Sequence, residues 1–228
     1  MNIKYYAIIV AGGSGTRMGG SVAKQFAQLQ EKLVIEHTID RFLSMDNVPE
    51  IILVLNPAYI DFWKEYCFKK ALHFRHTIVP GGITRYHSVK EALRYIKQEG
   101  VVAIHDSVRP FIKTEFLNSI YDLASQSGAV IPYLSPVDSM RKKDQKLSID
   151  DSKVVNRDDY IMIQTPQVFK TEILLKSYEK PYDTKYTDDA SVVEDSGFQL
   201  SYTPGDPMNI KLTRPEDLIM ARAILSVF

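Results

Sequence analysis

Short apolar runs typical of buried strands alternate with segments of helical apolar spacing from Tyr5 to Tyr133. This β-α order predicts an α/β fold of the Rossmann-like kind, with a mostly parallel sheet covered by helices on both faces. The expected strands are Tyr5–Ala11, Ile51–Leu55, Phe74–Val79, Val101–His105 and Ala129–Tyr133; the expected helices are Leu33–Leu43, Tyr59–Leu72, Thr84–Lys97 and Glu115–Ser125. In such folds ligands bind beyond the carboxyl ends of the strands.

A polar stretch, Ser135–Asp159, then breaks the alternation. It cannot bury enough apolar surface alone to offset its ordering entropy, so we expect a protruding arm that is ordered by packing on a second copy. Regular signals resume afterwards: strands at Tyr160–Thr165 and Leu200–Thr203, and helices at Glu172–Tyr178, Ala190–Asp195 and Pro215–Leu225. A chain of 228 residues has room for one sizeable core, so 1–228 is expected to be a single domain, with 135–159 as an arm within it.

Composition excludes several classes of protein. Basic and acidic residues balance at 28 each, which argues against nucleic-acid or anionic-membrane partners. The single cysteine, Cys67, excludes an internal disulfide and a CxxC zinc site, and it fits a cytoplasmic location. No apolar run reaches the ~18 residues of a membrane span, and Tyr5–Ala11 leads into glycines rather than a cleavage site.

The loop after the first strand is rich in glycine and carries two cations. It reads Ala11-Gly12-Gly13-Ser14-Gly15-Thr16-Arg17-Met18-Gly19, with Lys24 further on. Met18 breaks the dinucleotide pattern GxGxxG, and Ser21 stands where a P-loop needs lysine. Glycines let backbone N–H groups approach phosphates, so one interpretation is a loop that binds a triphosphate through Gly13, Gly15, Arg17 and Lys24. The alternative is a flexible turn with two solvated cations.

Three further segments follow later strands. Gly81-Gly82 precedes a helix that contains Ser88; bare glycines there allow contact with a flat nucleobase, although such a pair is more often a plain turn. Asp106 ends the fourth strand, where it could bind Mg²⁺ or a ribose hydroxyl, or could simply cap a helix or pair with Arg109. Lys211 precedes the last helix and could return to the same sheet edge.

Taken in order, these motifs resemble one family. They are Ala-Gly-Gly-Ser-Gly-Thr-Arg-Met-Gly, Ala-Lys-Gln-Phe, Gly-Gly-x-x-Arg-x-x-Ser-Val, His-Asp-x-x-Arg-Pro, Gln-Thr-Pro-Gln, Thr-Asp-Asp-Ala and Asn-Ile-Lys-Leu-Thr-x-Pro-Glu-Asp-Leu. The chain resembles the 2-C-methyl-D-erythritol 4-phosphate cytidylyltransferases from Tyr5 to about Ala223. The resemblance implies transfer of a cytidylyl group from CTP to methylerythritol phosphate in non-mevalonate isoprenoid synthesis. It also implies Mg²⁺ or another divalent cation as cofactor, and a homodimer formed through the arm.

The resemblance also implies roles for individual residues. Arg17 and Lys24 would hold the CTP phosphates and stabilise the pentacoordinate phosphorus. Ala11, Gly12, Gly82 and Ser88 would contact cytosine, and Asp106 and Ser107 the ribose, with Asp106 also near the metal. Arg109, Thr165 and Lys211 would complete the phosphoryl and polyol sites, and Ser139 and Arg157 would reach the substrate of the partner subunit.

Four positions depart from the family pattern: Gly12 where alanine is frequent, Ile83 and Met208 where acidic residues are common, and Ser139 in place of threonine. Two alternative functions stay open, a ribitol-5-phosphate cytidylyltransferase and a non-catalytic nucleotide-binding module. The Gly-Gly loop and Met208 favour ribitol phosphate. Arg157 and the segment 214–217 favour methylerythritol phosphate.

Overall fold

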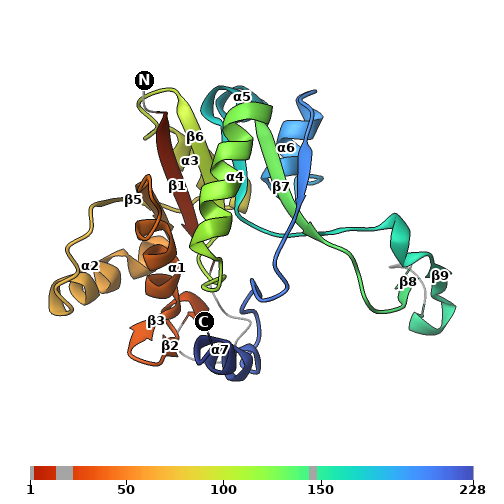
Figure 1. Ribbon diagram of the computed structural model, residues 1–228, viewed down its shortest axis with the longest axis horizontal. Helices are drawn as coiled ribbons and strands as arrows, with labels where there is room; N and C mark the ends of the chain where they lie inside the picture. The colour runs from red at the N-terminus through yellow and green to blue at the C-terminus, as the bar shows by residue number, and fades with distance from the viewer. Residues whose placement is uncertain (1–2, 14–22, 144–147, 228) are drawn as a thin grey trace.

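The computed structural model of the protein describes residues 3–13, 23–143 and 148–227. Helices and strands alternate along this part of the chain as the sequence predicts (Figure 1). The helices are α1 (Val34–Leu43), α2 (Ile60–Lys69), α3 (Arg85–Leu93), α4 (Thr114–Ser127), α5 (Thr171–Ser177), α6 (Asp189–Asp195) and α7 (Asp217–Leu225). The strands are β1 (Lys4–Ala11), β2 (Gln28–Leu29), β3 (Lys32–Leu33), β4 (Glu50–Leu55), β5 (His76–Pro80), β6 (Gly100–Asp106), β7 (Ala129–Leu134), β8 (Met140–Lys142), β9 (Lys153–Val155), β10 (Met162–Ile163), β11 (Gln167–Lys170) and β12 (Ser201–Pro204).

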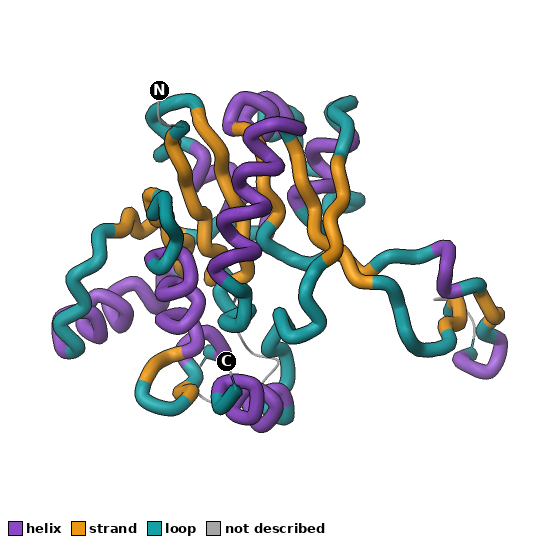
Figure 2. The backbone as a smooth tube through the Cα atoms, viewed as in Figure 1, coloured by secondary structure: helices purple, strands orange, loops and turns teal. Residues whose placement is uncertain are grey.

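The central sheet has the order β10-β7-β11-β6-β1-β4-β5, with β12 paired to β7 (Figure 2). The pairs β1–β4, β1–β6 and β4–β5 are parallel, and the returning strands β10 and β11 are antiparallel to their neighbours. The register sets Val10 opposite Asp106, and Leu55 opposite both Ala11 and Pro80. The carboxyl ends of four parallel strands therefore meet at one edge, which confirms the predicted fold class.

Both faces of the sheet are buried because alternate residues of each central strand point to opposite sides. Ala7 and Ile9 pack with residues of α1, α2 and α4, whereas Tyr6 and Ile8 pack with residues of α3, α5 and α6. Helix α4 crosses in front of the central strands in Figure 1. The first strand is an unbroken apolar run for this reason.

A smaller core holds the C-terminal segment below the strand ends. Leu212, Ala221 and Ile224 pack with Val108 and Phe111, the residues that follow β6. The backbone N–H of Leu212 donates to the carbonyl oxygen of Val108 at 2.9 Å. This contact carries the preceding residue, Lys211, back to the end of β6.

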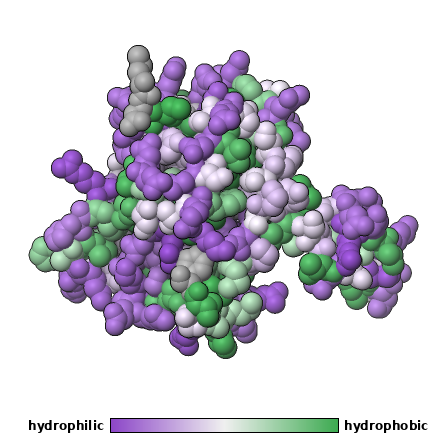
Figure 3. Space-filling model, in the orientation of Figure 1, coloured by the Kyte–Doolittle hydropathy of each residue, from purple (hydrophilic) through white to green (hydrophobic). Residues whose placement is uncertain are grey.

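The arm predicted at 135–159 stands away from the body of the molecule (Figures 1 and 3). Its strands β8 and β9 form an antiparallel hairpin in which Met140 faces Val155. The side chains of Val137, Ile149 and Val154 are between 62% and 78% exposed. These three apolar side chains are therefore not covered by the described residues of the arm.

Several elements differ from their predicted bounds, and three of the differences are informative. The strand expected at 160–165 is only Met162–Ile163, and the buried strand in this region is β11, which the sequence reading missed. Helix α3 ends at Leu93 because the next three N–H groups donate to carbonyls three residues back, which tightens the chain into a turn before β6. Helix α7 begins at Asp217, whose carboxylate accepts the N–H groups of Thr213 and Arg214.

In the three described stretches of the chain, every helix is too short or too polar to cross a lipid bilayer.

Substitution of Phe169 tests the position of β11 between β6 and β7. Phe169 is fully buried and pairs in register with Val102 and Ala129, so Phe169→Ala should lower the free energy of unfolding by about 3–5 kcal/mol. Phe68 on α2 is 87% exposed, so Phe68→Ala should change it by less than about 0.5 kcal/mol. Denaturant unfolding of both variants is the measurement, and equal losses would contradict this placement of β11.

Candidate active site

A cavity of about 440 Å³ lies at the carboxyl ends of β1, β4, β5 and β6. Its walls come from the loops that follow these strands, from the start of α3 and from the C-terminal segment. The lining residues are Val10, Ala11, Gly12, Gly13, Lys24, Gln25, Asn56, Gly82, Ile83, Thr84, Arg85, Ser88, Asp106, Ser107, Val108 and Lys211. The volume is in the range of small-ligand sites, and the position is the one expected of an open α/β fold.

Glycines form one wall of this cavity because the backbones there touch. A Cβ atom on Gly12 would lie 3.2 Å from the Ser88 hydroxyl oxygen, and one on Gly82 would lie 2.6 Å from the Cβ of His87. The Gly82 N–H donates to the Ser88 hydroxyl at 3.0 Å. Neither glycine has room for a side chain, so backbone atoms of Gly12 and Gly82 line the cavity here, beside the Ser88 hydroxyl.

Gln25 fixes the start of the glycine loop. Its side chain is buried, and its amide nitrogen donates to the carbonyl oxygens of Ala11 at 3.2 Å and Gly13 at 3.4 Å. The neighbouring Lys24 is thereby set at the wall of the cavity. Gly15 and Arg17, predicted for the same loop, lie outside the described residues.

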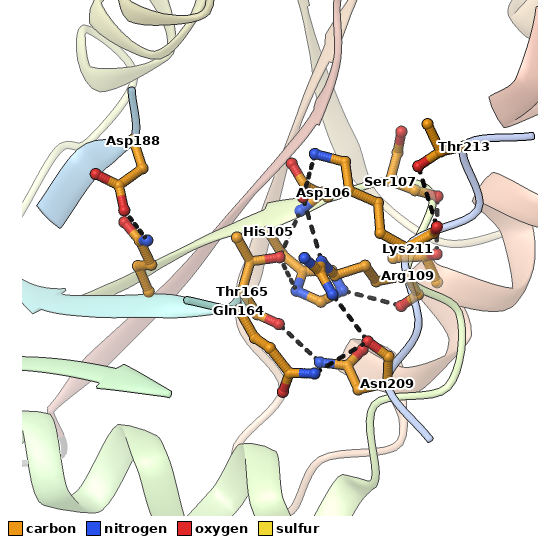
Figure 4. Close-up of polar contacts among 12 residues, drawn as sticks. His105, Asp106, Ser107, Arg109, Gln164, Thr165, Asp188, Asn209, Lys211 and Thr213 are labelled. Carbon is orange, nitrogen blue, oxygen red and sulfur yellow. Dashed lines mark hydrogen bonds and ion pairs between the residues drawn. The ribbon is translucent and has the colours of Figure 1, made fainter. Parts of the chain in front are cut away.

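At the end of β6, Asp106 pairs with two cations (Figure 4). Its Oδ2 atom lies 3.0 Å from Nζ of Lys211 and 3.3 Å from Nε of Arg109. Burial by itself raises the pKa of the Asp106 carboxyl, but the charge of Lys211, followed by those of Arg85 and Arg109, holds the pKa well below its ordinary value. Asp106 is therefore a carboxylate at every physiological pH.

A buried histidine connects the residues behind Asp106 (Figure 4). His105 Nε2 lies 3.0 Å from the carbonyl oxygen of Arg109, which can only accept, so this nitrogen carries the proton. Nδ1 then accepts from the Thr165 hydroxyl at 3.2 Å, and the Thr165 oxygen accepts the Asp106 N–H at 3.1 Å. Burial lowers the pKa of His105 to about 4, so the ring stays neutral and fixes Asp106 and Thr165.

Side-chain amides hold the C-terminal segment against this cluster. Asn209 donates to the Thr165 carbonyl at 2.9 Å, and Gln164 donates to the Asp206 carbonyl at 3.0 Å. The Arg109 guanidinium donates to the Asn209 carbonyl at 2.8 Å. These bonds explain the Gln-Thr-Pro-Gln and Asn-Ile-Lys motifs, since together they place Lys211 beside Asp106.

The predicted site residues fall into four groups. Those that line the cavity are Ala11, Gly12, Gly13, Lys24, Gly82, Ser88, Asp106, Ser107 and Lys211. Arg109 and Thr165 lie behind Asp106 and contact it rather than the cavity. Ser139 and Arg157 are on the arm and are absent from this cavity of their own chain. Gly15 and Arg17 are in the stretch 14–22 that the structure does not describe.

The sequence reading gave no role to Gln25, Asn56 and Arg85, which also line the cavity. Gln25 and Arg85 belong to the motifs Ala-Lys-Gln-Phe and Gly-Gly-x-x-Arg, so their spacing was a usable signal. Asn56 directly follows β4, and its side chain accepts the Ala58 N–H at 3.0 Å. In the sequence, only the position of Asn56 directly after a predicted strand indicated that it could lie near the site.

The donor set fits a divalent metal that is bound together with a ligand's phosphates. In the stretches that the structure describes, no cluster of three or more His, Cys, Asp or Glu side chains forms a complete metal site, and Asp106 is the one acidic residue that lines the cavity. Among the described residues, both ion pairs of Asp106 use Oδ2, which leaves Oδ1 as the oxygen that could bind a cation. Mg²⁺ commonly takes one or two carboxylates, with substrate oxygens and water as the other ligands.

Known proteins of one family match this sequence over nearly its whole length. The family described as 2-C-methyl-D-erythritol 4-phosphate cytidylyltransferase matches residues 5–227. The protein of that name from Phocaeicola vulgatus is 43% identical over 220 residues, covering 96% of this chain and 99% of its own; the one from Bacteroides thetaiotaomicron is 41% identical over 223 residues, covering 98% and 100%. The crystal structure of 4-diphosphocytidyl-2C-methyl-D-erythritol synthase from Anaerococcus prevotii aligns with a TM-score of 0.80 at 30% identity, covering 98% of this chain and 99% of that one. The chain therefore belongs to the 2-C-methyl-D-erythritol 4-phosphate cytidylyltransferase family.

Proposed function

We propose that this enzyme transfers the cytidylyl group of CTP to 2-C-methyl-D-erythritol 4-phosphate. The products are pyrophosphate and 4-diphosphocytidyl-2-C-methyl-D-erythritol, a precursor in non-mevalonate isoprenoid synthesis. The observation that carries the proposal is one cavity that joins a glycine wall to Lys24, Lys211 and Asp106, in a chain of this family. The glycine wall suits a flat base, and the cations suit phosphates.

The reaction is a displacement at phosphorus. An oxygen of the polyol phosphate forms a bond to the α-phosphorus of CTP, the bond from that phosphorus to the bridging oxygen of the β-phosphate breaks, and pyrophosphate leaves with the electron pair. A phosphate dianion is already a nucleophile, so catalysis needs alignment and positive charge more than a general base. The neutral, fully bonded His105 fits a structural role and not that of a base.

Lys24 and Lys211 line the cavity from two segments that are far apart in the sequence. We assign Lys24 to the CTP phosphates and Lys211 to the phosphate that attacks. Arg17 is assigned with Lys24 on the resemblance alone. Lys211 is held 3.0 Å from Asp106, so its ammonium position is set before substrate arrives and little reorganisation is needed during reaction.

Mg²⁺ is proposed as the cofactor. Asp106 Oδ1 and oxygens of the triphosphate would hold it, because Asp106 is the acidic residue that the described cavity offers. When bound, the metal would neutralise charge on the triphosphate and help pyrophosphate to leave. Met208 is 36% exposed and supplies no second carboxylate.

Methylerythritol phosphate is preferred over ribitol phosphate as the acceptor. Relatives that share 41% to 43% identity over nearly full length carry the methylerythritol phosphate name. A non-catalytic nucleotide-binding module is disfavoured because Lys24, Asp106 and Lys211 are present and converge on one cavity.

The arm supports a homodimer. Exposed apolar residues follow one another along it, with Val137 at 78%, Val154 at 75% and Ile149 at 62%. Burial of such residues against a second copy would supply the core that the arm lacks. Arg157 follows β9 on the arm, its side chain is half exposed, and its guanidinium donates to the Val137 carbonyl of the same arm. We place Arg157 and Ser139 at the polyol phosphate of the partner subunit.

A cytoplasmic location is proposed as well. It rests on the single, unpaired Cys67, whose thiol pKa burial raises to about 11, making it an unreactive packing residue.

The function is tested by pyrophosphate release from CTP and Mg²⁺ with each polyol phosphate. We expect rapid turnover with methylerythritol phosphate and little with ribitol 5-phosphate. Lys24→Ala should reduce kcat about a hundredfold or more, since an aligned charge in a dry phosphoryl site contributes on the order of 3 kcal/mol. Lys32→Ala, which removes an exposed lysine paired with Asp40, is the matched control and should leave the rate within about threefold. Faster turnover with ribitol 5-phosphate would reverse the assignment of the acceptor.

The metal proposal gives a titration. EDTA should abolish turnover, and excess Mg²⁺ should restore it. Asp106→Asn should raise the Mg²⁺ concentration that gives half-maximal rate, because a neutral amide is a poorer ligand for a hard cation. Asp46→Asn, an exposed site, is the control. If the Asp106 variant keeps the wild-type midpoint while kcat falls, Asp106 acts only by holding Lys211 and Arg109.

The arm proposal gives a complementation test. Lys24→Ala and Arg157→Ala chains, each inactive, are mixed under conditions that exchange subunits. In a two-fold dimer with exchanged arms, one heterodimer site carries both lesions and the other none, so activity should return to about half of wild type per heterodimer. Two differently tagged Lys24→Ala preparations serve as the control and should stay inactive. With heterodimers verified by native mass spectrometry, an inactive mixture would place Arg157 in its own subunit's site.

A further inference from the structure

Arg85 is a cation in the cavity wall that phosphoryl transfer does not by itself require. It is the first residue of α3, and its side chain is 29% exposed, with the open part facing the cavity. Its Nη2 atom donates to Oδ2 of Asp189 at 2.5 Å. Asp189 begins α6 and is completely buried, so the chain keeps a buried carboxylate in place to hold this one guanidinium.

The anchor itself is rigid. The second oxygen of Asp189 accepts the Tyr178 hydroxyl at 2.7 Å, and the Tyr178 ring stacks on Tyr86 with centroids 4.8 Å apart. A carboxylate bonded on both oxygens cannot rotate without breaking a bond. The Arg85 guanidinium is therefore fixed from behind by three other side chains.

The remaining donors of Arg85 are available to a ligand. A guanidinium has five N–H donors, and the bond to Asp189 is the one hydrogen bond that Arg85 makes within the described residues. Burial by itself lowers the pKa of Arg85, but Asp189 more than reverses this and raises it above the ordinary value. The group is a permanent cation with unused N–H donors at the cavity surface.

The direction of the Arg85 side chain indicates which part of the cavity its guanidinium faces. Helix α3 packs against β1, β4 and β5, under the glycine wall. Asp189 lies beside β11 instead. Its neighbours show this, since the side chain of Gln167 on β11 bonds to the Asp188 carboxylate and to the Ala190 N–H, each at 2.8 Å. To reach Asp189, the Arg85 side chain extends from α3 toward the β6–β11 side. The charge of Arg85 also contributes to the low pKa of Asp106, at the end of β6.

The β6–β11 side holds the groups suited to an acceptor phosphate. Lys211 and Asp106 lie there, and the arm leaves the body from β7, on the same half of the sheet (Figure 1). The base-binding features, the glycines and Ser88, lie at the ends of β1 and β5. A hydrogen-bond donor on the β6–β11 side is therefore nearer to the proposed position of the polyol phosphate than to that of the nucleobase.

We infer that Arg85 binds the oxygens of the polyol phosphate, with Asp189 as the residue that positions it. The inference rests on the proposed function and adds a substrate-binding residue to it. Because Asp189 already balances the charge, Arg85 contributes directed hydrogen bonds more than net attraction. Its loss should therefore weaken acceptor binding and leave CTP binding nearly unchanged.

The experiment measures KM for each substrate in four variants. Arg85→Gln should raise KM for methylerythritol phosphate about tenfold or more, the effect of one lost charge-assisted hydrogen bond, with KM for CTP within about threefold of wild type. Asp189→Asn, which can still accept the Tyr178 hydroxyl, should raise the same KM by less. The double variant should be no worse than Arg85→Gln alone, because Asp189 acts through Arg85. Arg94→Gln, at the exposed residue that directly follows the same helix, is the matched control.

Three results would overturn the inference. A rise in KM for CTP alone would assign Arg85 to the nucleotide, unchanged KM values with only a lower melting temperature would make it structural, and additive losses in the double variant would remove Asp189 as its positioning partner. If Arg85→Gln does not fold, Arg85→Lys keeps a cation beside Asp189 and should show the same selective rise, since an ammonium lacks the planar fork. A wild-type enzyme with no turnover on any polyol phosphate would instead refute the proposed function itself.

Discussion

Burial of β1 on both faces and both edges is the constraint on which the structure depends. Its residues alternate between two cores, and its backbone pairs with β4 on one edge and β6 on the other. A parallel strand enclosed in this way has no freedom of register, because a slip by one residue would exchange the two buried faces. The carboxyl ends of four strands are therefore level, and two strand ends that are 95 residues apart in the sequence, Ala11 and Asp106, line one cavity.

Electrostatic balance around Asp106 is the second consequence. One carboxylate faces Lys211, Arg109 and the more distant Arg85, and a second buried carboxylate, Asp189, stands behind Arg85. Each cation is thus held in place by an anion before substrate binds, which limits the cost of repulsion among like charges. Two anionic substrates would then meet prepositioned donors, and this is where an enzyme gains most from a fixed electrostatic environment.

The arm and the body of the molecule differ in how their apolar residues are covered. The sheet is stable because its apolar residues are enclosed by helices of the same chain, whereas Val137, Ile149 and Val154 of the arm are exposed. The polar composition of 135–159 was enough to predict that this segment leaves the core. The missed strand β11 shows the opposite case. Its four residues begin and end with polar side chains, Gln167 and Lys170, so no local pattern marks it, and only pairing with β6 and β7 makes it a strand.

The sequence by itself determined the α/β fold, most helix and strand positions, and the glycine, aspartate and lysine residues that line the cavity, because apolar periodicity and strand-end position are local properties. Residue types also sufficed to exclude a dinucleotide loop and a P-loop. Only the tertiary structure decided which cations touch Asp106, which nitrogen of His105 carries its proton, and that Arg85 is held by Asp189. The physical reason is distance along the chain: these contacts join residues up to 105 positions apart, and they exist only after two cores have closed around the sheet.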